Sequence, residues 1–420
     1  MREPPGPGMW QTYRRLRHTP LRQFPTFLFE IQREYGDVVA FRVPWRRFYF
    51  LNDPEAIKDV LITHQHAFVK SEGTRALGEL LGQGLVTSED PLHRRMRRIV
   101  QPAFHRERIA GYLQTMRRFA ESWRAPDSVF DMHAAMTELT LRIASTTLFG
   151  ADAGSEAERV SHALQEVVRV FPDAIGPFAW IRRKFPFGAM RRFRDSRSVL
   201  NDIVMRLISE RRRTGEDRGD ALSMLLASRD GDSGELLDDS QVRDEVMTLF
   251  VAGHETTANA LVWSWYLLAR YPEAAQKLSD ERYVDAILSE VLRLYPPVWI
   301  LGRNAKREVA AAGWRIRPRA AVLMSQMVMH RNPLYFDRPD DFLPERWLED
   351  RELPQFAYFP FGGGSRRCIG DQFAWMEAAT VLSTLGSRYR FELATTREVQ
   401  PMPIVTLRPD RPVLMRAVPH

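Results

Sequence analysis

The sequence of 420 residues contains one cysteine, Cys368, and only five lysines among its 60 basic residues. A single thiol excludes an internal disulfide and a multi-cysteine metal cluster, and it gives no sign of an oxidising compartment. No run of 18 or more apolar residues is present, which excludes a membrane-spanning helix. The N-terminus also lacks the apolar core of a signal peptide. A cytosolic protein with no transmembrane anchor is therefore expected.

The net charge of +7 comes from an excess of arginine. One interpretation is a GC-rich genome, and another is binding of nucleic acid. Because the basic residues are spread along the chain and no binding motif accompanies them, no nucleic-acid partner is expected.

Hydrophobic spacing predicts a mainly α-helical chain with short strands towards both ends. Residues 38–51 predict two strands joined by a turn at Pro44-Trp45. Irregular structure is expected at 173–190, in part of 215–240 and in the proline-rich stretch 331–361. Helices are predicted at 54–62, within 91–124, and at 131–150, 155–172, 191–213, 241–270, 280–294 and 370–388, with further strands at 306–325, 388–393 and 403–416. No repeat and no clear domain boundary is present.

The cysteine lies in the loop Phe361-Gly-Gly-Gly-Ser-Arg-Arg-Cys-Ile-Gly370. Glycines allow the backbone to turn tightly and bring N–H groups towards an acceptor. Positive charge and converging amides favour a thiolate over a thiol. The loop is therefore typical of a site for one sulfur anion.

Polar residues interrupt the apolar helix predicted at 241–270, in Ala252-Gly-His-Glu-Thr-Thr257. These residue types disfavour the middle of a helix, so a local distortion and a polar groove are expected there. A kink with only packing value is the alternative. A zinc-protease helix is excluded, because the second histidine that it requires would fall at Ala258.

Two further charge patterns have both a structural and a functional interpretation. Glu290 and Arg293 share one helix face and form either a surface ion pair or a buried anchor that Arg346 completes. The basic run His93–Arg98 is either a solvated helix face or an anion pocket.

Taken together, the order and spacing of these motifs closely resemble the cytochrome P450 family of haem-thiolate monooxygenases. The resemblance rests on Ala252-Gly-x-Glu-Thr256, Glu290-x-x-Arg293, Pro344-x-Arg346 and Phe361-x-x-Gly-x-Arg-x-Cys-x-Gly370. It implies the cytochrome P450 fold, mainly α with small β-sheets, with a large helical part around haem and a small β-rich part. It also implies one catalytic domain over residues 1–420, with no fused reductase domain.

The resemblance implies haem b as the cofactor, with the Cys368 thiolate as its metal ligand. Glu255 and Thr256 match the acid–alcohol pair that delivers protons during O2 activation. Glu290, Arg293 and Arg346 match a structural triad. The other residues matched to the haem site are His93, Arg97, Arg303, Arg366, Phe361, Gly364 and Gly370.

The implied reaction is insertion of one oxygen atom of O2 into a C–H bond of a hydrophobic substrate, such as a fatty acid, terpenoid, carotenoid or steroid. The positions matched to the substrate pocket are Val86, Val251, Ala252, Val298, Trp299 and Val405, and residues 173–190 are expected to form part of a lid. Electrons from NAD(P)H are expected through a separate ferredoxin with its reductase or through a flavodoxin, in the cytoplasm of a bacterium. Arg94, Arg98 and Arg367 could attract such an acidic partner.

Two rivals remain at this stage. One is a peroxygenase that uses H2O2 on the same fold, which the presence of Glu255 and Thr256 disfavours. The other is a non-catalytic haem sensor, which would need no proton relay.

Overall fold

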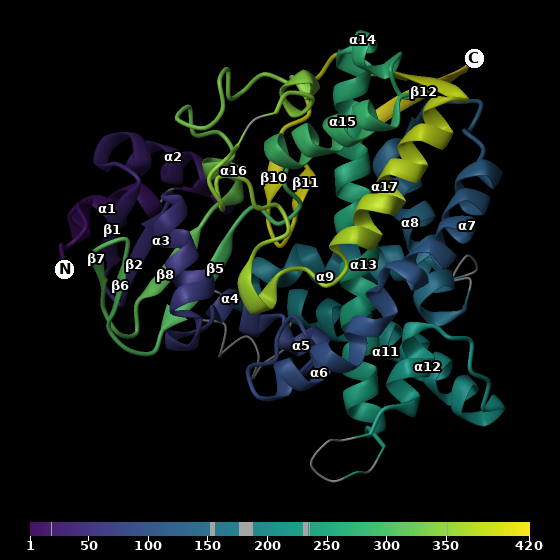
Figure 1. Ribbon diagram of the computed structural model, residues 1–420, viewed down its shortest axis with the longest axis horizontal. Helices are drawn as coiled ribbons and strands as arrows, with labels where there is room; N and C mark the ends of the chain where they lie inside the picture. The colour runs from purple at the N-terminus through teal and green to yellow at the C-terminus, as the bar shows by residue number, and fades with distance from the viewer. Residues whose placement is uncertain (18, 152–155, 176–187, 230–233, 235, 351) are drawn as a thin grey trace. The chain divides into compact units, whose positions relative to one another are not determined.

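The computed structural model describes the chain except for residues 18, 152–155, 176–187, 230–233, 235 and 351 (Figure 1). The chain is mainly helical with small sheets, as the sequence predicts. Its contacts divide it into two compact units. Unit 1 comprises Met1–Glu72, Asp285–Cys368 and Val399–Arg411, and unit 2 comprises Gly73–Val284, Ile369–Glu398 and Pro412–His420.

Unit 1 contains a five-stranded sheet in the order β1-β2-β8-β5-β3. The predicted hairpin is confirmed, with β1 at Val38–Val43 and β2 at Arg46–Leu51 in antiparallel register. β2 pairs in parallel with β8 (Ala321–Met324), and β5 (Leu301–Ala305) runs antiparallel to both β8 and β3 (Phe68–Lys70). Two small pairs complete the strands of this unit, β6 (Val309–Ala311) with β7 (Trp314–Ile316) and β10 (Pro401–Pro403) with β11 (Leu407–Pro409).

The large sheet is buried on both faces, because alternate residues of its strands enter different clusters. Val39 and Phe41 of β1 and Phe50 of β2 pack with Phe27 and Ile31 of helix α2 (Phe24–Tyr35). The intervening residues Val38, Tyr49 and Leu51 pack in a second cluster with helix α3 (Pro54–Lys58). The near-continuous apolar sequence of the hairpin follows from this arrangement.

The helix predicted at 54–62 has two parts. The Asp53 carboxylate caps α3 by accepting a bond of 2.7 Å from the Ala56 N–H. From Asp59 to Thr63 the chain then forms a π-helix, η2, in which the His64 N–H donates to the Asp59 carbonyl five residues earlier. Such π-turns often occur at functional sites.

Unit 2 is built from helices. Its long helices are α7 (Arg106–Ser122), α8 (Met132–Phe149), α9 (Ala157–Ile175), α11 (Ala189–Thr214), α13 (Asp239–Arg270) and α17 (Asp371–Gly386). Its sheet joins β4 (Phe130–Asp131), β12 (Leu414–Pro419) and β9 (Tyr389–Leu393). The shorter helices of the chain are α1 (Met9–Leu16), α4 (Glu72–Ala76), α5 (Gly78–Leu81), α6 (Leu92–Val100), α12 (Ala221–Ala227), α14 (Pro272–Ala275), α15 (Glu281–Leu294) and α16 (Gln326–Met329).

Helix α13 continues without interruption through Gly253–Thr257, so the expected local distortion does not break it. The reason is visible in its hydrogen bonds. The Thr256 hydroxyl donates to the Ala252 carbonyl at 2.8 Å, and the Thr140 hydroxyl of α8 donates to the His254 carbonyl at 3.1 Å. The polar groups are thus satisfied inside the helix packing rather than by opening the helix.

Other predictions differ in detail. Strand β5 begins before the predicted 306–325 region, and the strands predicted at 403–416 are three short ones, β10, β11 and β12. The stretch 331–361 is irregular apart from one 3-10 turn, η6 (Pro344–Trp347). Most of the 173–190 segment, and with it the predicted lid, lies outside the described residues. Within the described part of the chain, none of the helices combines the length and the apolar character needed to cross a membrane.

Candidate functional site

The cysteine loop of unit 1 is a tight turn that ends in an exposed thiol. Cys368 follows the 3-10 turn η7 (Gly364–Arg366) and is exposed. Its backbone N–H donates to the Phe361 carbonyl at 3.0 Å, and the Arg367 N–H donates to the Gly364 carbonyl at 3.2 Å. The sulfur therefore lies at the end of a loop held by its own backbone.

Gly364 shows why this loop needs glycine. Its φ of 68° lies in the left-handed region, and a Cβ at this position would lie 2.0 Å from the Leu61 carbonyl oxygen of η2. The Ser365 hydroxyl donates to Gln65 Oε1 at 2.5 Å beside this contact. The loop thus packs against the backbone of Leu61, which cannot move aside as the end of a flexible side chain could.

His330 holds the chain just before the loop. Its Nε2 accepts a hydrogen bond of 2.9 Å from the Phe359 N–H. Burial, followed by the nearby Arg293 charge, lowers the pKa of His330 to about 3. The ring therefore stays neutral at ordinary pH and keeps its acceptor nitrogen.

The structure brings together Glu290, Arg293 and Arg346. Glu290 and Arg293 are both fully buried. The Arg293 guanidinium donates from Nε and Nη2 to the two Glu290 oxygens, both at 2.8 Å, and Arg346 Nε donates to Glu290 Oε1 at 3.1 Å. The interpretation as a surface ion pair is therefore wrong, and the buried anchor is correct.

Sequence reasoning missed two partners of this carboxylate. Trp347 Nε1 donates to Glu290 Oε2 at 2.8 Å, and the Leu343 N–H donates to Oε1 at 2.9 Å. Trp347 directly follows Arg346 in the sequence, and this adjacency was the only sequence signal that Trp347 could also reach Glu290. The remaining N–H groups of Arg293 donate to the carbonyls of His330, Pro339 and Asp341 at 2.9, 2.6 and 3.0 Å.

Other predicted residues of unit 1 lie on its strands and turns. Arg303 is in β5, where its guanidinium donates to the Gly302 carbonyl at 2.9 Å. Trp299 is buried against Met327 and Leu407, and its Nε1 donates to the Ile404 carbonyl at 3.3 Å. Val298 and Val405 are half-buried. Their pocket roles, and that of Trp299, stay predictions.

In unit 2, the acid–alcohol pair lies near the middle of α13. Glu255 is buried, with an exposed fraction of 6%, and Thr256 follows it on the next position of the helix. Nδ1 of the neighbouring His254 lies 2.7 Å from the Phe250 carbonyl oxygen, which ties that ring to its own helix. Val251 is half-buried and Ala252 is exposed, one turn before the pair.

The basic run on α6 has one side that faces inward and one that faces solvent. His93 is buried, and its Nδ1 lies 3.5 Å from the Asp90 carboxylate. Arg97, one turn later, is half-buried, whereas Arg94 and Arg98 are exposed. The inward face can therefore contribute to an anion site, and the outward face is solvated.

The segment that carries Val86 is held against α13 by two glycines. A Cβ on Gly82 would lie 2.0 Å from the Asp244 carboxylate, and one on Gly84 would lie 2.1 Å from the Thr248 hydroxyl. The Leu85 N–H donates to the buried Glu245 carboxylate at 3.1 Å. Val86 is half-buried beside this contact. The Gly-x-Gly spacing was a signal that sequence reasoning did not use.

A buried carboxyl on α17 was also missed. Glu377 is fully buried, and burial raises the pKa of its carboxyl well above the usual range, while the Thr257 hydroxyl lowers that pKa by less. The raised pKa favours the protonated form of this carboxyl, which lies beside Thr257 on α13. Gly370 caps the start of the same helix, and a Cβ there would meet the Phe104 ring at 3.4 Å.

Comparisons with known proteins agree with this arrangement of motifs. The family model "Cytochrome P450" matches residues 4–415. A cyclooctatin synthase of Streptomyces melanosporofaciens is 38% identical over 89% of this chain and 87% of its own. A pentalenene oxygenase of Streptomyces avermitilis is 34% identical over 91% of this chain and 90% of its own. The crystal structure of CYP175A1 from Thermus thermophillus has a TM-score of 0.80 and 28% identity, and the alignment covers 98% of this chain and 99% of that one.

The contact between Gly364 and Leu61 predicts that Gly364→Ala strongly destabilises unit 1. Gly362→Ala is the matched control, because Gly362 has a similar φ of 69° but a Cβ there would meet only Leu301 Cδ1 at 3.6 Å. The control should lose about 1–2 kcal/mol from its backbone conformation. Gly364→Ala should lose clearly more, as measured by denaturant unfolding. Equal losses of unfolding free energy in the two variants would show that the contact with the Leu61 carbonyl adds nothing to the cost of a side chain at Gly364.

The raised pKa of Glu377 predicts a pH-dependent cost. The folded protein holds this proton to a higher pH than the unfolded chain, so the contribution of Glu377 to stability falls as pH rises above about 4.5, by up to about 1.4 kcal/mol per pH unit. Glu377→Gln cannot ionise, so its free energy of unfolding relative to the native protein should be higher at pH 7 than at pH 5. The exposed-site variant Glu392→Gln is the control. A parallel pH dependence for Glu377→Gln and the native protein would contradict the assignment.

Proposed function

Since the chain belongs to the cytochrome P450 family and is similar to a pentalenene oxygenase, we propose that it hydroxylates a cyclic, largely hydrocarbon terpenoid. The enzyme class is that of a P450 monooxygenase, an oxidoreductase. The observation that carries the proposal is the loop of the sole cysteine, with its exposed thiol and its left-handed glycine packed on Leu61.

The residues present fit a haem with a thiolate ligand. Cys368 offers one exposed sulfur as a ligand. One protein ligand suits a haem iron, because the porphyrin supplies the other ligands. Arg303, Arg366, His93 and Arg97 are the groups proposed to bind the two propionates, because basic side chains, and guanidinium forks in particular, suit carboxylates. When bound, haem supplies the iron that activates O2.

The chain's own groups would tune and serve this chemistry. Phe361, Gly364 and Gly370 shape the backbone around the sulfur, so that amide N–H groups can donate to it and set its basicity. On α13, the Thr256 hydroxyl donates to the Ala252 carbonyl at 2.8 Å and can exchange that acceptor for a bound ligand. Glu255 follows as the group that would resupply the proton.

The proposed substrate class rests on the apolar positions and on the relatives. Val86, Val251, Val298 and Val405 are half-buried, and apolar surfaces of this kind bind by excluding water. A further relative, a cyclooctat-9-en-7-ol 5-monooxygenase of Streptomyces melanosporofaciens, is 35% identical over 89% of this chain and 84% of its own. By their names, this relative and the pentalenene oxygenase act on an alkenol and an alkene. A terpenoid therefore fits better than a fatty acid.

Electron supply is proposed to come from a separate ferredoxin or flavodoxin. Arg94, Arg98 and Arg367 are exposed, and an acidic partner would be steered by such charges. This predicts an association rate that falls as ionic strength rises.

The thiolate assignment predicts the spectrum of Cys368→Ser. The native protein, reconstituted with haem, reduced and exposed to carbon monoxide, should show the strongly red-shifted Soret band of a thiolate-ligated haem. Cys368→Ser should lose that band, because a serine oxygen is a poorer electron donor to iron. Survival of the band in the variant would refute Cys368 as the ligand.

The proton-delivery assignment predicts uncoupling in Thr256→Ala. With ferredoxin, reductase and a terpenoid substrate, NAD(P)H consumption should continue while product per NAD(P)H falls at least tenfold, within the range that one acid–base group contributes. Thr256→Ser keeps the hydroxyl and should restore most of the coupling. Undiminished product from Thr256→Ala would reject this role for Thr256, and efficient turnover with H2O2 alone but none with reductant would favour the peroxygenase.

A further inference from the structure

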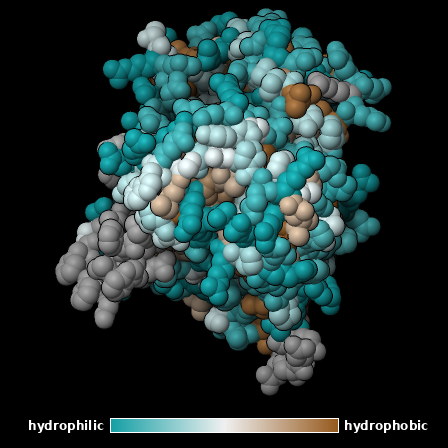
Figure 2. Space-filling view, turned by 90° about the vertical axis from the view of Figure 1, so that its left-hand side faces the viewer, coloured by the Kyte–Doolittle hydropathy of each residue, from teal (hydrophilic) through white to brown (hydrophobic). Residues whose placement is uncertain are grey.

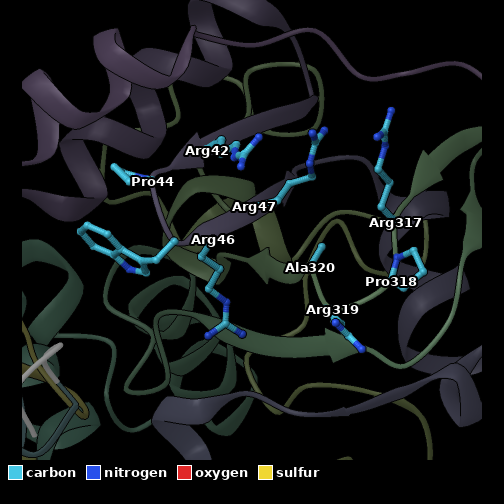
Figure 3. Close-up of a pocket in the computed structure, with 9 residues that line it drawn as sticks. Arg42, Pro44, Arg46, Arg47, Arg317, Pro318, Arg319 and Ala320 are labelled. Carbon is cyan, nitrogen blue, oxygen red and sulfur yellow. The ribbon is translucent and has the colours of Figure 1, made fainter.

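An arginine-rich pocket lies in unit 1, among residues that the monooxygenase assignment does not use. Its volume is about 330 Å3, and we call it the arginine pocket (Figure 3). The hairpin between β1 and β2 forms one part of its wall, and the turn between β7 and β8 forms the other. The lining residues are Arg42, Pro44, Trp45, Arg46, Arg47, Arg317, Pro318, Arg319 and Ala320.

The hairpin places two of these charges side by side. Arg42 and Arg47 are direct partners in the antiparallel register of β1 and β2. Like charges directly opposite each other destabilise a strand pair. The arrangement therefore costs stability unless an anion lies between or above the two guanidinium groups.

The opposite turn carries a second cost. In Arg317-Pro318-Arg319-Ala320, Arg319 has a φ of 62°. Proline followed by a residue of positive φ is typical of a type II turn, in which glycine is the favoured residue at that position. With an arginine at this position, the backbone is strained by the left-handed φ. Backbone strain of this kind is concentrated at functional sites.

The charges in the pocket are not balanced by the chain itself. Arg317 donates to the Glu3 carboxylate at 2.6 Å, and Arg46 pairs with Glu72. Among the described residues, Arg42 and Arg319 form no ion pair with a carboxylate, and Arg47 acts on the Glu3 carboxylate only through its charge, without an ion-pair contact. The charges of Arg42 and Arg319, and part of that of Arg47, are thus left for a ligand.

The side chains flank the pocket on two sides. In the view of Figure 3, Arg42, Arg47 and Arg317 extend to one side, and Arg46 and Arg319 extend to the other. Arg46 and Arg47 are consecutive on β2, so their side chains point to opposite faces of the strand.

The surrounding surface favours a polar ligand over an apolar partner. Figure 2 shows the face that carries the left-hand elements of Figure 1, including β1, β2, β6 and β7, and this face is mostly hydrophilic with small scattered hydrophobic patches. Trp45 is the exception at the pocket, with 68% of its surface exposed. Its indole offers a flat face on which an organic group could stack.

We propose that the arginine pocket binds the two phosphate groups of an organic diphosphate. Guanidinium groups bind phosphate through paired hydrogen bonds. A phosphomonoester carries about −1.5 to −2 near neutral pH, and the inner phosphate of a diphosphate adds about one more charge, so the ligand is opposite in sign to Arg42, Arg47 and Arg319 and comparable with them in charge. Trp45 contacts the organic part of the ligand. No residue of the pocket belongs to the haem or substrate assignments, so this proposal can fail without affecting them.

Arg319→Gly is the decisive variant, because it removes one pocket charge and gives the turn its favoured residue. Arg338→Gly is the matched control, since Arg338 also has a positive φ, of 46°, and lies outside the pocket. Isothermal titration of the full chain with inorganic diphosphate at low ionic strength should give saturable binding to the native protein and to Arg338→Gly. Arg319→Gly should bind inorganic diphosphate at least about tenfold more weakly than the native protein. Its melting temperature should equal or exceed the native value. No binding to the native protein, or equal affinities of the two variants, would overturn the proposal.

The organic part is tested with adenosine diphosphate and Trp45→Ala. The variant should keep its affinity for inorganic diphosphate and lose affinity for the nucleotide. An unchanged nucleotide affinity would overturn the assignment of Trp45.

Vesicles distinguish a free diphosphate from a phospholipid headgroup. If vesicles of phosphatidylglycerol bind the protein and inorganic diphosphate displaces them, the same phosphate site serves both sources. If they bind through Arg319 and diphosphate does not displace them, the free ligand is wrong and an anionic lipid surface takes its place.

Discussion

The buried contact between Glu290 and Arg293 is the interaction on which the rest of unit 1 depends. Two charges without access to water would cost several kcal/mol if they were incompletely paired. Here all five N–H groups of Arg293 donate, and the Glu290 carboxylate also accepts from Arg346, Trp347 and the Leu343 N–H. The pair thus holds residues 330–347, and His330 in turn holds Phe359 two residues before the cysteine loop. These contacts position the loop that carries the Cys368 thiol.

Unit 2 solves a different problem, that of placing polar groups in an apolar helix. Thr256 bonds to its own helix, Thr140 reaches the His254 carbonyl from α8, and burial favours the protonated form of Glu377. None of these solutions opens α13. Glu255 and Thr256 therefore lie on a continuous helix.

Much of the fold and of the candidate site could be predicted, because its signals are local. The turn at Pro44-Trp45, the apolar run of α13 and the glycines near Cys368 all act within a few residues. The unpredicted parts depend on contacts between segments far apart in sequence. Strand β5 is formed through its pairing with β8 and β3, the Leu61 carbonyl leaves no room for a side chain at Gly364, and the pKa of Glu377 is raised because its side chain is buried. The local distortion expected within Ala252–Thr257 does not interrupt α13, because helix propensity does not count hydroxyls that bond back to carbonyls.

The acceptors of Arg293 have a consequence for how this chain can vary. Three of its five hydrogen bonds end on the main-chain carbonyls of His330, Pro339 and Asp341 rather than on side chains. A carbonyl is present whatever residue carries it, so these bonds set the course of the segment without constraining its amino acids. Sequence drift at the exposed positions between 331 and 341 is therefore compatible with an unchanged backbone path, whereas the buried Phe336 packs on the Arg293 guanidinium. A library of substitutions there should preserve the loop far better than any replacement of the arginine itself.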